Sequence, residues 1–168
     1  MATWKSLYST KEDEVLDAIK AAEEVGTVEW VRPLLEIVRD HPAEDIKAAA
    51  AGVLGTLKVS AAEDVLGDAL DDPEFEAIGA DIVGYLWNCG FHSEDLLPAV
   101  VRCAVRGDFR SAMEALTWVE QLEGLNGEGD LLESILVVRG GLEDQSLSEV
   151  HALLQPLLDN LHRLERTQ

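Results

Sequence analysis

Apolar residues recur along most of this chain at spacings of three and four, the period of an amphipathic helix. The segment DEVLDAIKAAEEV places Val15, Ala18, Ile19 and Ala22 on one face, and the segments IKAAAAGVLGTL, RSAMEALTWVEQL and LLESILVV follow the same rule. Signals of a half-buried strand, in which apolar and polar residues alternate, are absent. The pattern therefore predicts an all-α protein with about nine or ten short helices.

Residues that start and stop helices divide the chain between these segments. Thr10, Ser93 and Ser148 precede expected helices, where a hydroxyl can accept from a free backbone N–H. Glycines that follow apolar residues, Gly26 and Gly90 among them, are typical C-terminal stops. We therefore expect short turns between the helices.

Self-comparison of the chain shows a period of about 32 residues. The segments RPLLEIVRD, EDVLGDALDD, LPAVVRCAVR and GDLLESILVV align on their second residues, which are Pro33, Asp64, Pro98 and Asp130. Five positions later each segment has a small or apolar residue, in turn Val38, Ala69, Cys103 and Ile135. The helices between these segments form a second column with Val25, Leu57, Cys89 and Leu122. Both columns are expected to lie in one continuous core.

Two helices per unit, with a proline or aspartate early in the second helix, resemble the HEAT-repeat family of α-solenoids. The stretch WNCGFHSEDLLPAVVRCAVRGDFRSAMEALTWVE looks like small bacterial HEAT-repeat proteins. The resemblance implies one domain over residues 1–168, a right-handed α-solenoid of about four helical hairpins. The expected repeats cover residues 10–42, 43–73, 74–107 and 108–145, and a capping helix is expected over residues 146–166. Outer helix faces in such a stack stay free to bind.

Charge narrows the choice of partner. The chain has 33 acidic and 13 basic residues and a net charge of −20, spread over its whole length. No block is basic enough to follow a phosphate backbone, so nucleic acid is a poor partner. Two explanations stay open, namely adaptation to concentrated salt and an acidic surface for a basic partner.

Length and cysteine content indicate where the protein works. The 168 residues suit a single domain, and two cysteines are too few for a disulfide scaffold. The N-terminal residues MATWKSLYSTKEDE do not resemble a secretory signal, and no apolar run approaches the ~20 residues of a membrane span. We expect a cytoplasmic protein that does not enter a membrane.

The segment WNCGFH at residues 87–92 is the strongest candidate for chemistry. Cys89, His92 and Cys103 lack a convincing fourth zinc ligand, and a nucleophilic cysteine would need an activating histidine held by a third group. Both cysteines occupy hydrophobic columns, so we expect two buried, unpaired thiols. His92 is expected in a solvated turn. No catalytic residue, metal or cofactor is predicted.

Four residues are candidates for binding a partner. Arg102 and Arg106 share a helix face, and Arg139 lies in the corresponding helix of the next repeat, so the three are expected to form a positive island. The alternative is internal pairing of these arginines with carboxylates. Trp30 precedes an apolar stripe and is expected to protrude as an aromatic anchor, whereas Trp87 and Trp118 are expected in or beside the core.

These observations favour a protein-interaction scaffold that uses the face formed by the second helix of each repeat. The expected partner is another protein, and the isolated chain is expected to be a monomer. Two alternatives stay open. One is an enzyme of lyase or isomerase type on a HEAT-like solenoid, for which tight retention of a pigment would be the sign. The other is a structural subunit of a larger assembly.

Overall fold

A computed structural model describes residues 2–106 and 108–167, and every regular element within them is helical. The α-helices of these residues are α1 (Glu12–Val25), α2 (Val31–Asp40), α3 (Glu44–Leu54), α4 (Ala62–Leu70), α5 (Gly79–Asn88), α6 (Leu97–Arg106), α7 (Phe109–Glu120), α8 (Glu128–Glu143) and α9 (His151–Arg166). Five 3-10 helices lie before or between them, namely η1 (Trp4–Tyr8), η2 (Val28–Trp30), η3 (Pro73–Ile78), η4 (Glu94–Leu96) and η5 (Gln145–Val150). The all-α prediction is confirmed.

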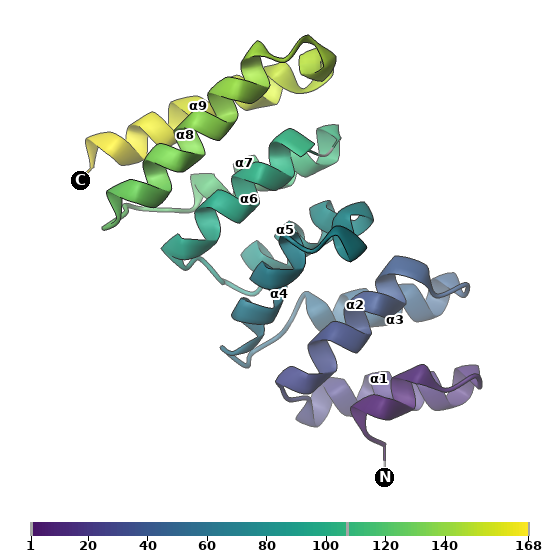
Figure 1. Cartoon of the computed structure of the whole chain (residues 1–168). Coiled ribbons are helices and arrows are strands. Elements are labelled where there is room, and N and C mark those ends of the chain that lie inside the picture. Colours follow the sequence, from purple (N-terminus) through teal and green to yellow (C-terminus); the bar gives the residue numbers. More distant parts are fainter. Residues whose placement is uncertain (1, 107, 168) are drawn as a thin grey trace.

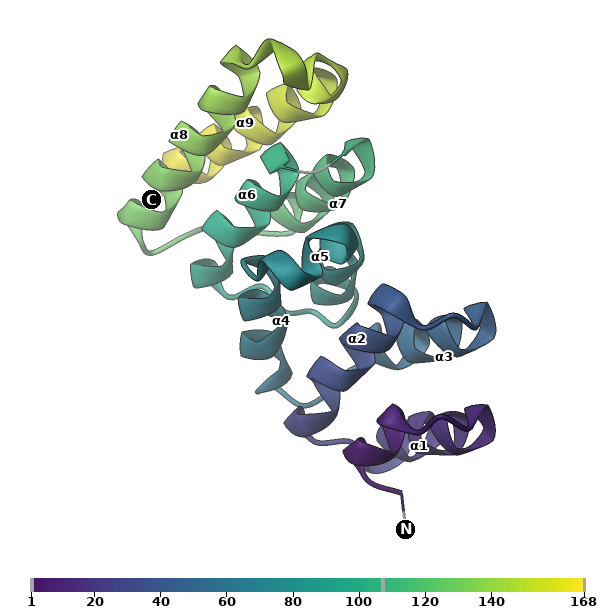
Figure 2. The same cartoon turned by 45° about the vertical axis from the view of Figure 1, so that its right-hand side comes forward.

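The helices build an elongated stack of two layers, with the chain ends at opposite ends of the stack (Figures 1 and 2). In one layer α2, α4, α6 and α8 pack against one another in chain order. In the other layer α1 packs on α3, and α5, α7 and α9 pack on one another in turn. Helices next to each other in the stack are therefore about one sequence period apart.

Consecutive helices also pair between the two layers. α2 packs on α3, α4 on α5, α6 on α7, and α8 on α9. Figure 1 shows α8 and α9 running antiparallel along their length. The sequence-based repeats pair each helix of the first layer with the preceding helix instead, and their boundaries stay a prediction.

Most of the repeated apolar columns lie in the seam between the layers. Ala69, Cys103 and Ile135 are buried, and Leu122 of the other column is buried as well. Val25 is an exception, because 74% of its surface is exposed. It is the last residue of α1, at the end of the stack, where α3 is the neighbouring helix of its layer. The expectation that Val25 lies in the core is wrong.

None of the helices in residues 2–106 and 108–167 is long and apolar enough to cross a membrane. The longest, α8 and α9, have 16 residues each.

Candidate functional site

The segment WNCGFH forms the end of α5 and the turn that follows it. Gly90 has a φ of 75°, a left-handed conformation that favours glycine. The N–H of Phe91 donates to the carbonyl of Leu86 at 2.8 Å, and that of Gly90 donates to Trp87 at 3.2 Å. This pair of bonds is a Schellman motif, which closes the helix and confirms the stop at Gly90.

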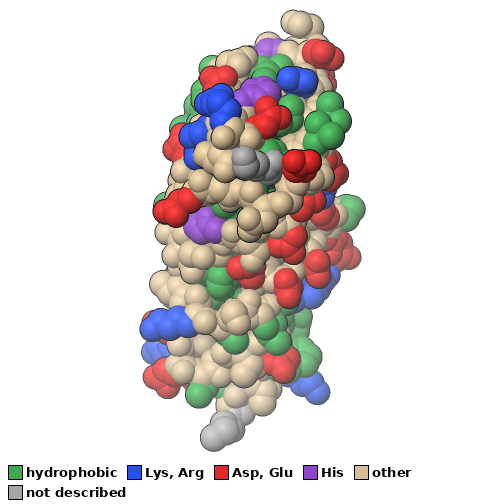
Figure 3. Space-filling model, turned by 90° about the vertical axis from the view of Figure 1, so that its left-hand side faces the viewer, with side chains coloured by type: hydrophobic (Ala, Val, Ile, Leu, Met, Phe, Trp, Pro, Cys, Tyr) green, Lys and Arg blue, Asp and Glu red, His purple; other side chains and the backbone are tan. Residues whose placement is uncertain are grey.

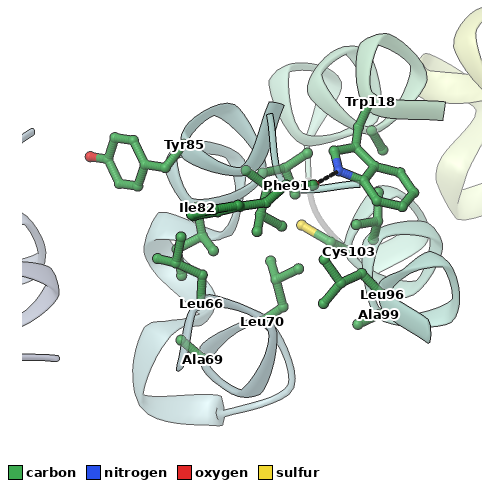
Figure 4. Close-up of a cluster of buried hydrophobic side chains, with 14 of the residues drawn as sticks. Leu66, Ala69, Leu70, Ile82, Tyr85, Phe91, Leu96, Ala99, Cys103 and Trp118 are labelled. Atoms are coloured by element: carbon green, nitrogen blue, oxygen red, sulfur yellow. Dashed lines mark hydrogen bonds between the residues drawn. The ribbon is translucent and has the colours of Figure 1, made fainter. Parts of the chain in front are cut away.

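The turn places Phe91 and His92 against Trp118 of α7. The indole N–H of the buried Trp118 donates to the carbonyl of Phe91 at 2.8 Å (Figure 4). The ring of His92 stacks on the indole with centroids 5.5 Å apart. The Nε2 atom of His92 is buried and has no hydrogen-bond partner within the described residues. The prediction of a solvated His92 is wrong, because the Schellman turn directs this residue back onto α7.

The two thiols lie in separate surroundings and form no disulfide. The buried Cys103 lies among apolar side chains of α4, α5 and α6 (Figure 4). Cys89 is only partly buried, and its Sγ donates to the carbonyl of Leu54 in α3 at 3.2 Å. Burial raises the pKa of both thiols, which keeps them protonated and poorly nucleophilic at neutral pH. Burial is therefore confirmed for Cys103 and only partial for Cys89.

Metal-ligating side chains do not gather in the part of the chain that the structure describes, where no group of three or more His, Cys, Asp or Glu residues is placed to hold an ion.

Arg102 links three helices of one layer. Its Nη2 and Nε atoms donate to the two carboxylate oxygens of Asp71, just after α4, at 2.9 and 3.2 Å. Its Nη1 donates to Glu133 of α8 at 3.1 Å. The hydrogen bonds to Asp71 raise the pKa of Arg102, which keeps its charge fixed. The contact with Asp71 is bidentate, the geometry in which a guanidinium binds a carboxylate most strongly.

Arg106 lies beside Arg102 and contacts the same end of α4. Its Nη2 donates to the carbonyl of Leu70 at 3.0 Å, and it lies 3.9 Å from Asp71. Its Nε donates to the carbonyl of Arg102 at 3.3 Å. The two arginines thus come together as predicted, but they form the internal pairs of the alternative interpretation.

Arg139 and Trp30 do not join them. Arg139 is exposed and forms no ion pair with the residues that the structure describes. It follows Glu133 by six positions, so the two side chains point about 120° apart around α8. Trp30 ends η2 and is only 8% exposed, packed into the core. The prediction that Trp30 protrudes is wrong, because the 3-10 turn directs the indole inward.

Sequence reasoning missed four exposed apolar side chains in the C-terminal half. Phe109 and Met113 on α7 are 50% and 46% exposed, and Leu132 and Leu136 on α8 are each 58% exposed. Both pairs have a spacing of four residues, so each forms a ridge on its helix. The sequence did contain a signal for the pair on α8. The segment LLESILVV has more apolar residues than a single buried stripe on one helix face requires.

The described surface has several hollows, one of them of about 290 Å³ beside η1, where Leu7, Tyr8 and Pro33 line it. A groove of about 580 Å³ lies between the ends of α1 and α3, with Glu23, Glu24 and Lys58 as its charged lining. A small cavity of about 70 Å³ adjoins Cys103 and is lined also by Arg106 and Ser111.

The surface is strongly acidic, as the net charge of −20 requires. Figure 3 shows acidic side chains along the length of the stack on one of its sides.

Comparison of the chain with protein-family models, with curated proteins and with solved structures finds no match.

Proposed function

We propose that this protein is a protein-interaction scaffold with the architecture of a right-handed, HEAT-like α-solenoid. Its partner is another protein, which binds the outer face of α2, α4, α6 and α8. The isolated chain is a monomer that works in the cytoplasm.

One observation carries this proposal: the four helices of that layer follow one another along the stack and each contributes exposed side chains. Examples are Arg32 on α2, Asp64 and Asp68 on α4, Arg106 on α6 and Leu136 on α8. Such an extended surface, rigidly held by the seam behind it, is how stacked helical pairs bind other proteins. Its acidic character favours a partner with a basic surface.

Affinity capture from the source organism at its own salt concentration tests the proposal. The wild-type chain should retain a partner in stoichiometric amount. The variant Asp64→Lys/Asp68→Lys, on the outer face of α4, should lose it. The variant Asp13→Lys/Asp17→Lys is the matched control, because these aspartates are exposed at the same spacing on α1 of the other layer. Failure of the wild-type chain to retain any partner would reject the scaffold proposal, and equal losses in both variants would reject this face.

A further inference from the structure

The neighbouring helices α6 and α8 differ in what they expose. α6 buries most of its apolar side chains, and its outward residues are Arg102 and Arg106. α8 buries a similar stripe but also carries the exposed pair Leu132 and Leu136. These leucines face neither α6 nor α9, as the contacts of α8 show.

The contacts of α8 define its sides. Glu133 meets Arg102 of α6, so it lies on the side of α8 that faces α6. A Cβ atom at Gly141 would lie 2.9 Å from Val105 of α6 and 3.1 Å from Leu154 of α9, so Gly141 lies where the sides facing these two helices meet. With about 100° per residue, Leu132 and Leu136 point about 100° and 60° away from Glu133, and about 180° and 140° away from Gly141. They also lie outside the buried stripe that packs on α9.

An alignment of the buried stripes of α6 and α8 shows which residue of α6 corresponds to Leu132. Leu97, Val101 and Ala104 of α6 match Leu131, Ile135 and Val138 of α8, and all six are buried. This alignment uses an offset of 34 residues, two more than the sequence column in which Pro98 matched Asp130. In it Leu132 takes the place of Pro98, which is buried in α6. Val105, on the same side of α6 as Pro98, is the residue that meets Gly141 of α8. Leu132 thus continues the side through which one helix of this layer contacts the next.

Charges around the leucines indicate what kind of helix fits there. The nearby exposed acids on α8 are Glu128 and Glu143, whereas Glu133 is paired with Arg102 of α6, and the one exposed base on the described part of α8 is Arg139. A second copy of the chain would bring its own net charge of −20 to this acidic ridge. A basic partner would instead gain favourable attraction as it approaches.

We propose that the ridge of Leu132 and Leu136 is the docking site for an amphipathic helix of a partner protein, with basic residues beside its apolar face. The helix stacks on α8 as a further member of the layer. Its apolar side chains cover the two leucines, and its basic side chains meet Glu128 and Glu143. This inference rests on the proposed function. It extends the binding face to the free side of α8 and names the chemistry of the partner.

Two synthetic amphipathic peptides of about 18 residues, or five helical turns, serve as probes. Both have leucines at positions i, i+3, i+4 and i+7, and their polar positions hold lysine and arginine in one peptide and glutamate in the other. Fluorescence anisotropy measures their binding to the full chain. The basic peptide should bind the wild-type protein at least about tenfold more tightly than the acidic peptide does.

Paired variants locate the site without changing the charge. Leu132→Ser/Leu136→Ser should weaken binding of the basic peptide by at least about tenfold. Phe109→Ser/Met113→Ser is the matched control, since it removes an equally spaced exposed pair from α7, and it should bind like the wild type. A benzophenone group on the apolar face of the peptide should crosslink to α8 of the wild-type chain, which locates the site independently of any variant.

The inference would be overturned if the basic peptide did not bind at about 100 µM, or if the two peptides bound equally well. It would also be overturned if the two serine pairs had equal effects on binding, or if the peptide crosslinked outside α8. Self-association that the α8 serine pair abolishes, seen by analytical ultracentrifugation, would make a second copy the occupant and would equally overturn it. A natural partner that is captured and then retained by the α8 serine pair would reject this site while the scaffold proposal stands.

Discussion

The two ends of the stack are closed to different degrees. At the N-terminal end the short helix η1 packs on both α1 and α2, with Leu7 buried and the hydroxyl of Tyr8 donating to Glu36 at 2.7 Å. At the C-terminal end α8 contacts α6 and α9, and its third side exposes Leu132 and Leu136. Stacked helical units need covered ends to remain soluble. Val25 and Tyr8 are exposed at the N-terminal end, but they belong to different elements, whereas Leu132 and Leu136 form one ridge on α8. The C-terminal end is therefore the better place to bind another helix.

The largest expected effect concerns the closed end. Leu7→Ala removes a buried side chain from the contact of η1 with α1 and α2, and it should lower the free energy of unfolding by about 2–5 kcal/mol. Urea denaturation followed by circular dichroism measures this loss. Val25→Ala is the control, because this residue belongs to the same end and is exposed, and it should change stability by less than about 0.5 kcal/mol. Equal effects would show that η1 does not close this end.

Arg102 holds the open end in place. Arg102→Met removes the contacts with Asp71 and Glu133 and should cost about 1 kcal/mol, a modest value because the side chain is 33% exposed. Amide hydrogen exchange should become faster in α8. Arg139→Met is the control, and it should leave both stability and exchange unchanged. Faster exchange in the control as well would refute the assigned role of Arg102.

The Arg102 pairs illustrate what the sequence could and could not predict. Helices were predictable because burial of one face imposes a period near 3.6. The partners of Arg102 lie 31 residues before and after it, so one sequence period separates each pair. Reading charges at that spacing would have found them. Trp30 was misjudged because a 3-10 turn rotates side chains differently from the α-helix that follows it.

Helix starts were predicted less well than helix interiors. Ser93 precedes a helix but accepts no capping bond, and Ser148 lies inside η5. The caps come from Asp72, Asp108 and Asp144, whose carboxylates accept from backbone N–H groups of Glu74, Ser111 and Ser146. In so acidic a chain, capping aspartates cannot be told from solvated ones before the turns are known. The exposed leucines of α8 could not be assigned either, because a sequence pattern does not show which side of a helix lacks a neighbour.

Added salt should stabilise the whole fold. The chain has 33 acidic and 13 basic residues, so the repulsion among unpaired carboxylates should exceed the attraction within the ion pairs. Added NaCl screens this net repulsion. The melting temperature should therefore rise between low salt and about 1 M NaCl. A flat or falling melting temperature would rule out net repulsion as a destabilising force and with it the interpretation as adaptation to salt.

The smallest expected effect is a difference in the labelling rates of the two thiols, measured in the folded protein. Cys89 should react with N-ethylmaleimide before Cys103, because Cys89 is only partly buried. Burial raises the pKa of both thiols, so labelling should accelerate as pH increases above neutrality. The folded state favours the neutral thiols, so the free energy of unfolding should fall as pH rises above about 8.5, where unfolded thiols ionise. Mass spectrometry of timed samples measures the order, and simultaneous labelling would contradict the burial of Cys103.

The central claim is that α8 has an apolar side that no other helix covers. Two adjacent leucines of α8 test this most directly. Leu131 is buried and Leu132 is 58% exposed. Equilibrium unfolding of Leu131→Ala should show a loss of about 2–5 kcal/mol, whereas Leu132→Ala should stay within about 0.5 kcal/mol of the wild type. Comparable losses in the two variants would mean that Leu132 is packed inside the protein, and α8 would then have no free apolar side for a partner.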